Sequence, residues 1–125
     1  MERMTREQMV AEFGAPGVQN PMILDLITTD AASGDVVLAM IERRPWGSDP
    51  LQFKQIEEKI NRYLAYVLDG FLVQQHPTYQ GLRVRLRLDC AEAPHGDAVR
   101  FVAAATEAIR REGLDLVVNV APAAT

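Results

Sequence analysis

Residues 82–90 have the sequence Leu-Arg-Val-Arg-Leu-Arg-Leu-Asp-Cys, in which apolar and polar side chains alternate without interruption. A period of two is typical of a β-strand that buries one of its faces. Cys90 has the same parity as the leucines of this stretch. We therefore expect its thiol to be buried and unreactive.

A helix and another strand are predicted after this strand. Residues 94–112 carry apolar side chains at helical spacing and are followed by Gly113, and residues 114–121 alternate again. Strand, helix and strand together form a βαβ unit, in which the crossover is right-handed and the two strands are parallel.

A hairpin and a long helix are predicted before it. Residues 22–29 and 36–43 are rich in β-branched and apolar side chains and flank the turn-forming residues 30–35. Apolar side chains then recur every three or four residues from about 49 to 75, through Gly70. We expect this helix to carry the chain over the first strand, which gives the spatial strand order 2-1-3-4.

The predicted fold is α/β (α+β), a two-layer sandwich. A mixed four-stranded sheet from the hairpin and the βαβ unit has two long helices on one face. A short N-terminal helix opening with the capping box at Thr5, together with a Gly- and Pro-rich linker, accounts for residues 1–21. Residues 22–121 form the domain, and residues 122–125 a tail.

Composition restricts the partners and the compartment. The formal charge of −4 disfavours nucleic acid and anionic membranes, and a lone cysteine among 125 residues indicates no disulfide framework. The charged N-terminal residues do not resemble a signal peptide, and no apolar run is long enough to span a membrane. We expect a cytoplasmic protein without a cofactor or metal.

Both faces of the hairpin carry apolar side chains, and the helices can cover only one. A large uncovered apolar patch is unusual for a soluble monomer. We therefore expect a homodimer formed through the helix-free sheet face, with the N-terminal helix as an additional cover. The predicted interface residues are Ile23, Ile27, Val37, Ala39, Ile41 and Val117.

Chemically versatile side chains follow the two strands that we expect to be parallel. Ligands of such sheets bind beyond the carboxyl ends of the strands. The alternative to an interaction domain is therefore a small-molecule binding protein or enzyme at this edge, and whether the chain is an enzyme stays open. The candidate ligand-binding residues are Arg43, Trp46, Asp89, Glu92 and His95.

Simpler interpretations of these residues are preferred. Trp46, between a strand and a helix, suits a plug over the end of the core. Cys90 and His95 are not favoured as a nucleophile and base, because the strand pattern buries Cys90. His76 and His95 have no metal-ligand spacing.

Arg83, Arg85 and Arg87 share one face of the alternating strand. They could bind a polyanion, but we expect ion pairs with neighbouring strands instead. Asp25 and Asp115 are the expected partners of Arg85.

Several segments resemble an uncharacterised family of small bacterial proteins, a domain of unknown function. The most specific is Glu42-Arg43-Arg44-Pro45-Trp46, a Glu-x-Arg-Pro-Trp segment, and the similarity covers residues 22 to about 112. The resemblance implies domain limits and supplies no catalytic residues.

Overall fold

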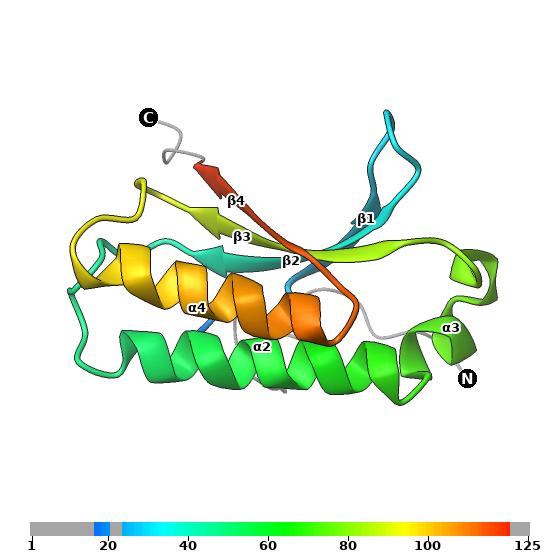
Figure 1. Cartoon of the computed structure of the whole chain (residues 1–125), viewed down its shortest axis with the longest axis horizontal. Coiled ribbons are helices and arrows are strands. Elements are labelled where there is room, and N and C mark those ends of the chain that lie inside the picture. Colours follow the sequence, from blue (N-terminus) through cyan, green and yellow to red (C-terminus); the bar gives the residue numbers. More distant parts are fainter. Residues whose placement is uncertain (1–16, 21–23, 121–125) are drawn as a thin grey trace, which may run out of the picture.

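The computed structural model describes residues 17–20 and 24–120 (Figure 1). The elements in chain order are β1 (Leu26–Thr29), β2 (Val36–Glu42), α2 (Gln52–Leu68), α3 (Phe71–Gln75), the 3₁₀ turn η1 (Pro77–Tyr79), β3 (Val84–Cys90), α4 (Asp97–Arg111) and β4 (Leu116–Val120). The predicted N-terminal helix and Ile23 lie outside the described residues. No helix in the described part is long and apolar enough to cross a membrane.

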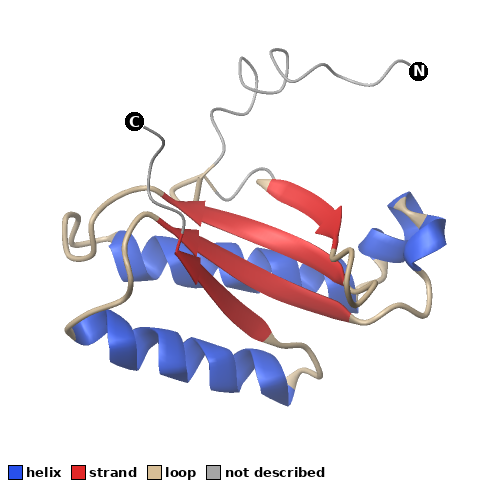
Figure 2. Ribbon diagram, turned by 90° about the horizontal axis from the view of Figure 1, so that it is seen from above, coloured by secondary structure: helices blue, strands red, loops and turns tan. Residues whose placement is uncertain are grey.

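The strands form one mixed sheet in the order β1-β2-β3-β4, with α2 and α4 on the same face (Figure 2). β1 and β2 are antiparallel, whereas β2–β3 and β3–β4 are parallel. The predicted α+β sandwich is confirmed, but the order 2-1-3-4 is wrong. α2 crosses beneath the sheet, and β3 then pairs with β2 on the side away from β1, so β1 is an edge strand.

The position of β2 explains its composition. Six of the seven residues from Val36 to Glu42 are buried. Leu38 and Met40 contact the core beneath the sheet, which also contains Ile56 and Tyr63 of α2. On the open face, Val37 and Ala39 are buried as well, whereas the edge strand β1, with the sequence Leu-Ile-Thr-Thr, is less apolar.

The predicted helix over residues 49–75 is two helices. α2 ends at Leu68, and Gly70 has φ 86°, a left-handed conformation that interrupts the helix before α3 begins at Phe71. The apolar spacing persists across the break because α3 still buries Leu72 in the core. Glycine accepts this conformation without the steric cost that a Cβ would bring.

The hairpin register corrects the predicted faces of β1. Thr29 pairs with Val36 across the six-residue loop 30–35, so Ile27 lies opposite Leu38 and Leu26 opposite Ala39. Opposite residues of an antiparallel pair share a face. Ile27 therefore faces the helices, and Leu26 faces the open side.

Candidate functional site

A notch lies where β2 and β3 end and α4 begins, as predicted for this edge. Its volume is about 180 Å³, and its lining residues are Trp46, Gly47, Phe53, His95, Gly96, Asp97 and Ala98. Phe53 packs against Trp46 at 6.3 Å between ring centroids and stacks on Phe101 at 4.7 Å. Trp46 is buried and closes the end of the core, as expected for a plug.

Glu92 joins the loop after β3 to the loop after β2. Its Oε1 accepts the backbone N–H of Trp46 (2.8 Å), and its carbonyl oxygen accepts the indole N–H (3.0 Å). Nε2 of His95 lies 3.1 Å from the same Oε1. The hydrogen bond from the Trp46 N–H is the main cause that lowers the pKa of Glu92 below its usual value, and the bond with His95 is the second.

The chemistry of this notch is limited by its bonds. The ionised Glu92 is held by a backbone donor, and His95 is exposed. Cys90 faces the core, where burial raises the pKa of its thiol to about 12, and its Sγ lies 3.7 Å from the Leu88 carbonyl oxygen. The predicted burial of Cys90 is confirmed, and the raised pKa disfavours the thiolate that a nucleophile with His95 as its base would need.

Of the five predicted ligand-binding residues, only Trp46 and His95 line this notch, and Glu92 is hydrogen-bonded to both. Asp89 lies on the open sheet face, where it binds Arg87 Nε (2.7 Å) and Asn119 Nδ2 (3.2 Å). Arg43 is exposed after β2. The structure thus brings Trp46, Glu92 and His95 together and places Asp89 and Arg43 elsewhere.

The turn from β2 into α2 is fixed by buried polar side chains. Glu42 forms a two-pronged ion pair with Arg44 (2.9 and 2.7 Å), which also reaches Asp49 (3.1 Å). Gln52 accepts the Gly47 N–H (2.8 Å) and donates to the Pro45 carbonyl (3.2 Å). These bonds give the segment a structural role, since its polar side chains are already paired within the chain.

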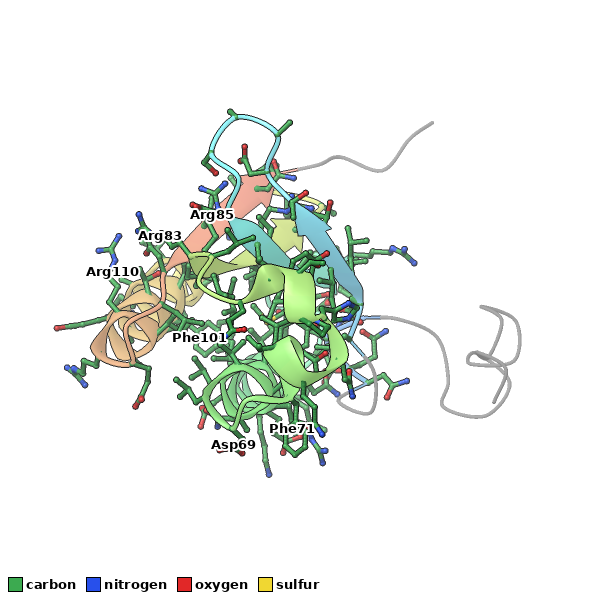
Figure 3. All side chains as sticks on the ribbon, turned by 90° about the vertical axis from the view of Figure 1, so that its right-hand side faces the viewer. Asp69, Phe71, Arg83, Arg85, Phe101 and Arg110 are labelled. Carbon is green, nitrogen blue, oxygen red and sulfur yellow. The ribbon has the colours of Figure 1, made fainter. Side chains whose placement is uncertain are left out.

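The open face of the sheet contains a hollow of about 280 Å³ between the hairpin and β4. Arg85 and Arg87 contribute to it, and both are neutralised. Arg85 forms an ion pair with Asp30 and lies 3.9 Å from Asp35, while Arg87 pairs with Asp89. The predicted face of Arg85 is confirmed (Figure 3), but the predicted partners are wrong.

The expected partners of Arg85 are bound by other cations. Asp25 pairs with Lys59 (2.8 Å), and Asp115 pairs with Arg110 (2.9 Å). The bond to Arg110 is the main cause that lowers the pKa of Asp115.

The observed register places the predicted interface residues on different faces of the sheet and at different depths. Val37 and Ala39 lie on the open face but are already buried within the chain, and Ile41 is half-buried. Ile27 faces the helices. Val117 remains, exposed by 38%.

Three of the eight large apolar side chains that are exposed in the described residues lie at the side of the sandwich formed by β4 and α4, namely Val99, Val117 and Val120. Val120 is 43% and Val99 is 53% exposed. Spacings of four, three and four residues place Val99, Ala103, Thr106 and Arg110 on one stripe of α4. Arg110 reaches Asp115 just before β4, so this stripe faces the β4 side, whereas Phe101 points toward α2 (Figure 3).

A buried polar cluster, the Lys59 clasp, was not predicted from the sequence. Nζ of Lys59 donates to Asp25 Oδ1 (2.8 Å) and to the carbonyls of Gly17 (3.0 Å) and Asn20. Asp25 also accepts the N–H groups of Gly17 and Ile41 (both 2.9 Å). The clasp fastens residues 17–20 and Asp25 to β2 and α2.

Tyr63 completes the clasp. Its hydroxyl donates to the Ala39 carbonyl (2.8 Å) and accepts the Asp25 N–H (2.7 Å), and its burial raises its pKa. Burial also lowers the pKa of Lys59. The one sequence signal that could have pointed to the clasp is a lysine on the apolar side of a predicted helix. By itself, such a lysine indicates a side chain whose amine reaches the solvent.

Comparison with known proteins places the chain in a family. The model of DUF6572, a family of unknown function, matches residues 17–122. The chain belongs to this family. The DUF6572 match begins at Gly17, which the Lys59 clasp holds, and confirms the resemblance to a domain of unknown function. No curated protein and no solved structure matches the chain.

Proposed function

We propose that this DUF6572 protein is a non-enzymatic protein-interaction domain that works by self-association, as a homodimer. The observation that carries the proposal is the exposed apolar surface of Val99, Val117 and Val120 beside an edge strand. Covering such a surface gains roughly 25 cal/mol per Å² before the costs of association. A second copy is the simplest occupant because most homo-oligomers are built about a two-fold axis.

The helix-free face, which the sequence favoured as the interface, is less suited to self-association. Its central apolar residues Val37 and Ala39 are buried without a second copy, and Arg85 and Arg87 are engaged in ion pairs. The surface is also hollowed, and two hollow faces do not fit each other about a two-fold axis. The open face is better suited to a convex partner.

The test of self-association is the mass in solution. Sedimentation equilibrium and light scattering of the full chain from 1 to 200 μM, on the order of the affinities common for weak to moderate dimers, should give twice 13.9 kDa at the upper end. A mass of 13.9 kDa throughout would reject the proposal.

The notch at Trp46 supports a second candidate, a small-molecule binding protein. Its aromatic wall and the adjacent His95 and Asp97 suit a small ligand with an aromatic or cationic group. Trp46 is the only tryptophan, so its fluorescence would report occupancy. A fragment screen with no change in Trp46 emission would exclude this candidate.

Two further expectations belong to the proposal. The formal charge of −4 and the paired arginines of β3 support a partner other than nucleic acid. The lone buried Cys90 is consistent with a cytoplasmic protein. Fluorescence microscopy of a tagged chain in its native cell tests the location.

A further inference from the structure

We propose that two copies join through antiparallel pairing of β4, so that their sheets form one eight-stranded sheet and their α4 helices become neighbours. This inference rests on the proposed self-association and names its surface. It uses the free edge of β4, the side chains on that strand and the exposed stripe of α4.

The hydrogen-bonding groups of β4 alternate between β3 and the free edge. Asp115 O accepts the N–H of Leu86 (2.8 Å) on the β3 side, and residues 116–120 continue the parallel ladder. Val117 and Asn119 therefore direct their peptide groups to β3, and Leu116, Val118 and Val120 direct theirs outward. Within residues 17–20 and 24–120, no strand pairs with this outer side.

A two-fold axis that passes midway between the Val118 residues of two copies lets these outward N–H and C=O groups bond to one another. The two Val118 residues exchange two hydrogen bonds, and each Val120 N–H donates to the Leu116 carbonyl of the second copy. The Leu116 N–H is not needed, since Asp115 Oδ1 already accepts it (2.9 Å). The four bonds thus leave this intramolecular bond intact.

The side chains that meet in this pairing match. On the helix side, Val118 lies opposite itself and Leu116 opposite Val120 of the second copy, so apolar contact continues the core. On the open side, Val117 lies opposite Asn119. No charged residue faces another across the strand pair.

The α4 stripe extends the contact below the sheet. The axis is perpendicular to the sheet, so both helix layers lie on the same side and the two α4 helices run antiparallel. Val99 and Ala103, which are exposed, then face the second copy together with half-buried Thr106. Arg110 and Asp115, paired with each other, lie at the rim.

The other edge of the sheet is a poorer site for a second copy. β1 has four residues, of which Thr28 and Thr29 are polar. Its hairpin also turns up and away from the plane of the sheet (Figure 1). A second copy paired there would find neither an apolar strand nor a helix flank.

Disulfide trapping tests the register. With Val118→Cys, the two cysteines face each other at about 5.5 Å between Cα atoms, within the range for a disulfide. Mild oxidation should link most chains into dimers, whereas the control Asn119→Cys, which lies opposite Val117, should stay mostly unlinked. Native Cys90 is buried and gives no background. Linking of Asn119→Cys in preference to Val118→Cys would overturn the register.

A matched pair of lysine variants tests the surface. Val120 and Leu26 are exposed to the same extent, 43% and 44%, on β4 and on the open face. Val120→Lys should weaken dimerisation at least tenfold, and Leu26→Lys should not, with circular dichroism confirming that both fold.

The outcomes separate this inference from the proposed function. A wild-type chain that stays monomeric rejects both. A wild-type dimer that dissociates with Leu26→Lys and persists with Val120→Lys rejects pairing through β4 but keeps self-association. Retention of the dimer in both variants, with no trapping of Val118→Cys, likewise rejects the β4 surface.

Discussion

At the scale of single residues, the clearest prediction concerns the contribution of Lys59 to stability. Lys59 is fully buried, and its ammonium group satisfies Asp25 and two backbone carbonyls. Lys59→Met fills similar volume but leaves a buried carboxylate without its cation, which costs about 3–5 kcal/mol. Urea denaturation should show this loss in the free energy of unfolding.

Asp25→Asn should also destabilise, and the double variant should lose less than the sum of the two by about 0.5–3 kcal/mol. Arg100→Ala is the control, because Arg100 and its partner Asp97 are both exposed and should barely affect the denaturation midpoint. Additive losses at Lys59 and Asp25 would show that the two side chains do not act as a pair.

Cys90 gives a second prediction at this scale. Burial and the nearby carboxylates of Glu42 and Asp89 raise the pKa of its thiol to about 12. A thiol reagent at pH 8 should label the native protein only as fast as the protein unfolds, and fully in urea. The exposed Asn119→Cys variant gives the rate for an accessible thiol. Labelling of native Cys90 at that rate would contradict the burial.

At the scale of elements, periodicity predicted β3, β4 and both long helices, because it depends only on which side chains need a core. β1 and β2 were predicted from their apolar, β-branched composition around turn-forming residues. Strand order was not accessible in the same way. The apolar run of β2 and the threonines of β1 agree with a central and an edge strand, but β3 alternates with charged residues and is central too. Composition therefore does not determine the strand order by itself.

The register could have been predicted, whereas the clasp could not. The predicted turn 30–35 has the observed six residues, and closing it with Thr29 opposite Val36 already places Ile27 opposite Leu38, so the predicted faces of β1 did not follow from the predicted turn. Asp25 and Lys59 are 34 residues apart, and the sequence offers several acids for each cation. At the candidate site, Trp46, Glu92 and His95 lie together as predicted, although the predicted order placed β1 between β2 and β3. The loops after β2 and β3 meet because these two strands are direct neighbours.

The bond from Trp46 to Glu92 couples the loops that follow β2 and β3, and it predicts a pH dependence. The folded pKa of Glu92 lies below its ordinary value of 4.5. A carboxyl group with a lowered pKa stabilises the fold above its unfolded pKa, and this contribution is lost as the pH falls through the folded pKa. The part of the change in Trp46 emission that depends on Glu92 should therefore occur below about pH 4.5.

Glu92→Gln keeps an oxygen acceptor for the Trp46 N–H but has no proton to gain in this range. Its fluorescence should therefore lack the part of the acid transition that belongs to Glu92. Identical titrations of the two proteins would mean that another group controls the environment of Trp46.

At the scale of the whole molecule, one helix layer covers one face of a four-stranded sheet (Figure 2). Within residues 17–20 and 24–120, no element covers the other face or the side at β4 and α4. The two uncovered surfaces differ in kind. The open face neutralises its arginines within the chain, and the side at β4 and α4 presents valines and unpaired strand groups. The proposed dimer uses only the second surface.

Dimerisation through this side makes the stability of the fold depend on protein concentration. Association that occurs only in the folded state stabilises it by mass action, by about 1.4 kcal/mol per mole of dimer for each tenfold rise in concentration. Differential scanning calorimetry should therefore give a Tm that rises between 5 and about 500 μM for the wild type, a range chosen to span micromolar affinities. The Val120→Lys variant should unfold at one Tm throughout, because its folded state gains no partner. Leu26→Lys should follow the wild type, and a wild-type Tm that is independent of concentration would contradict a dimer of folded chains.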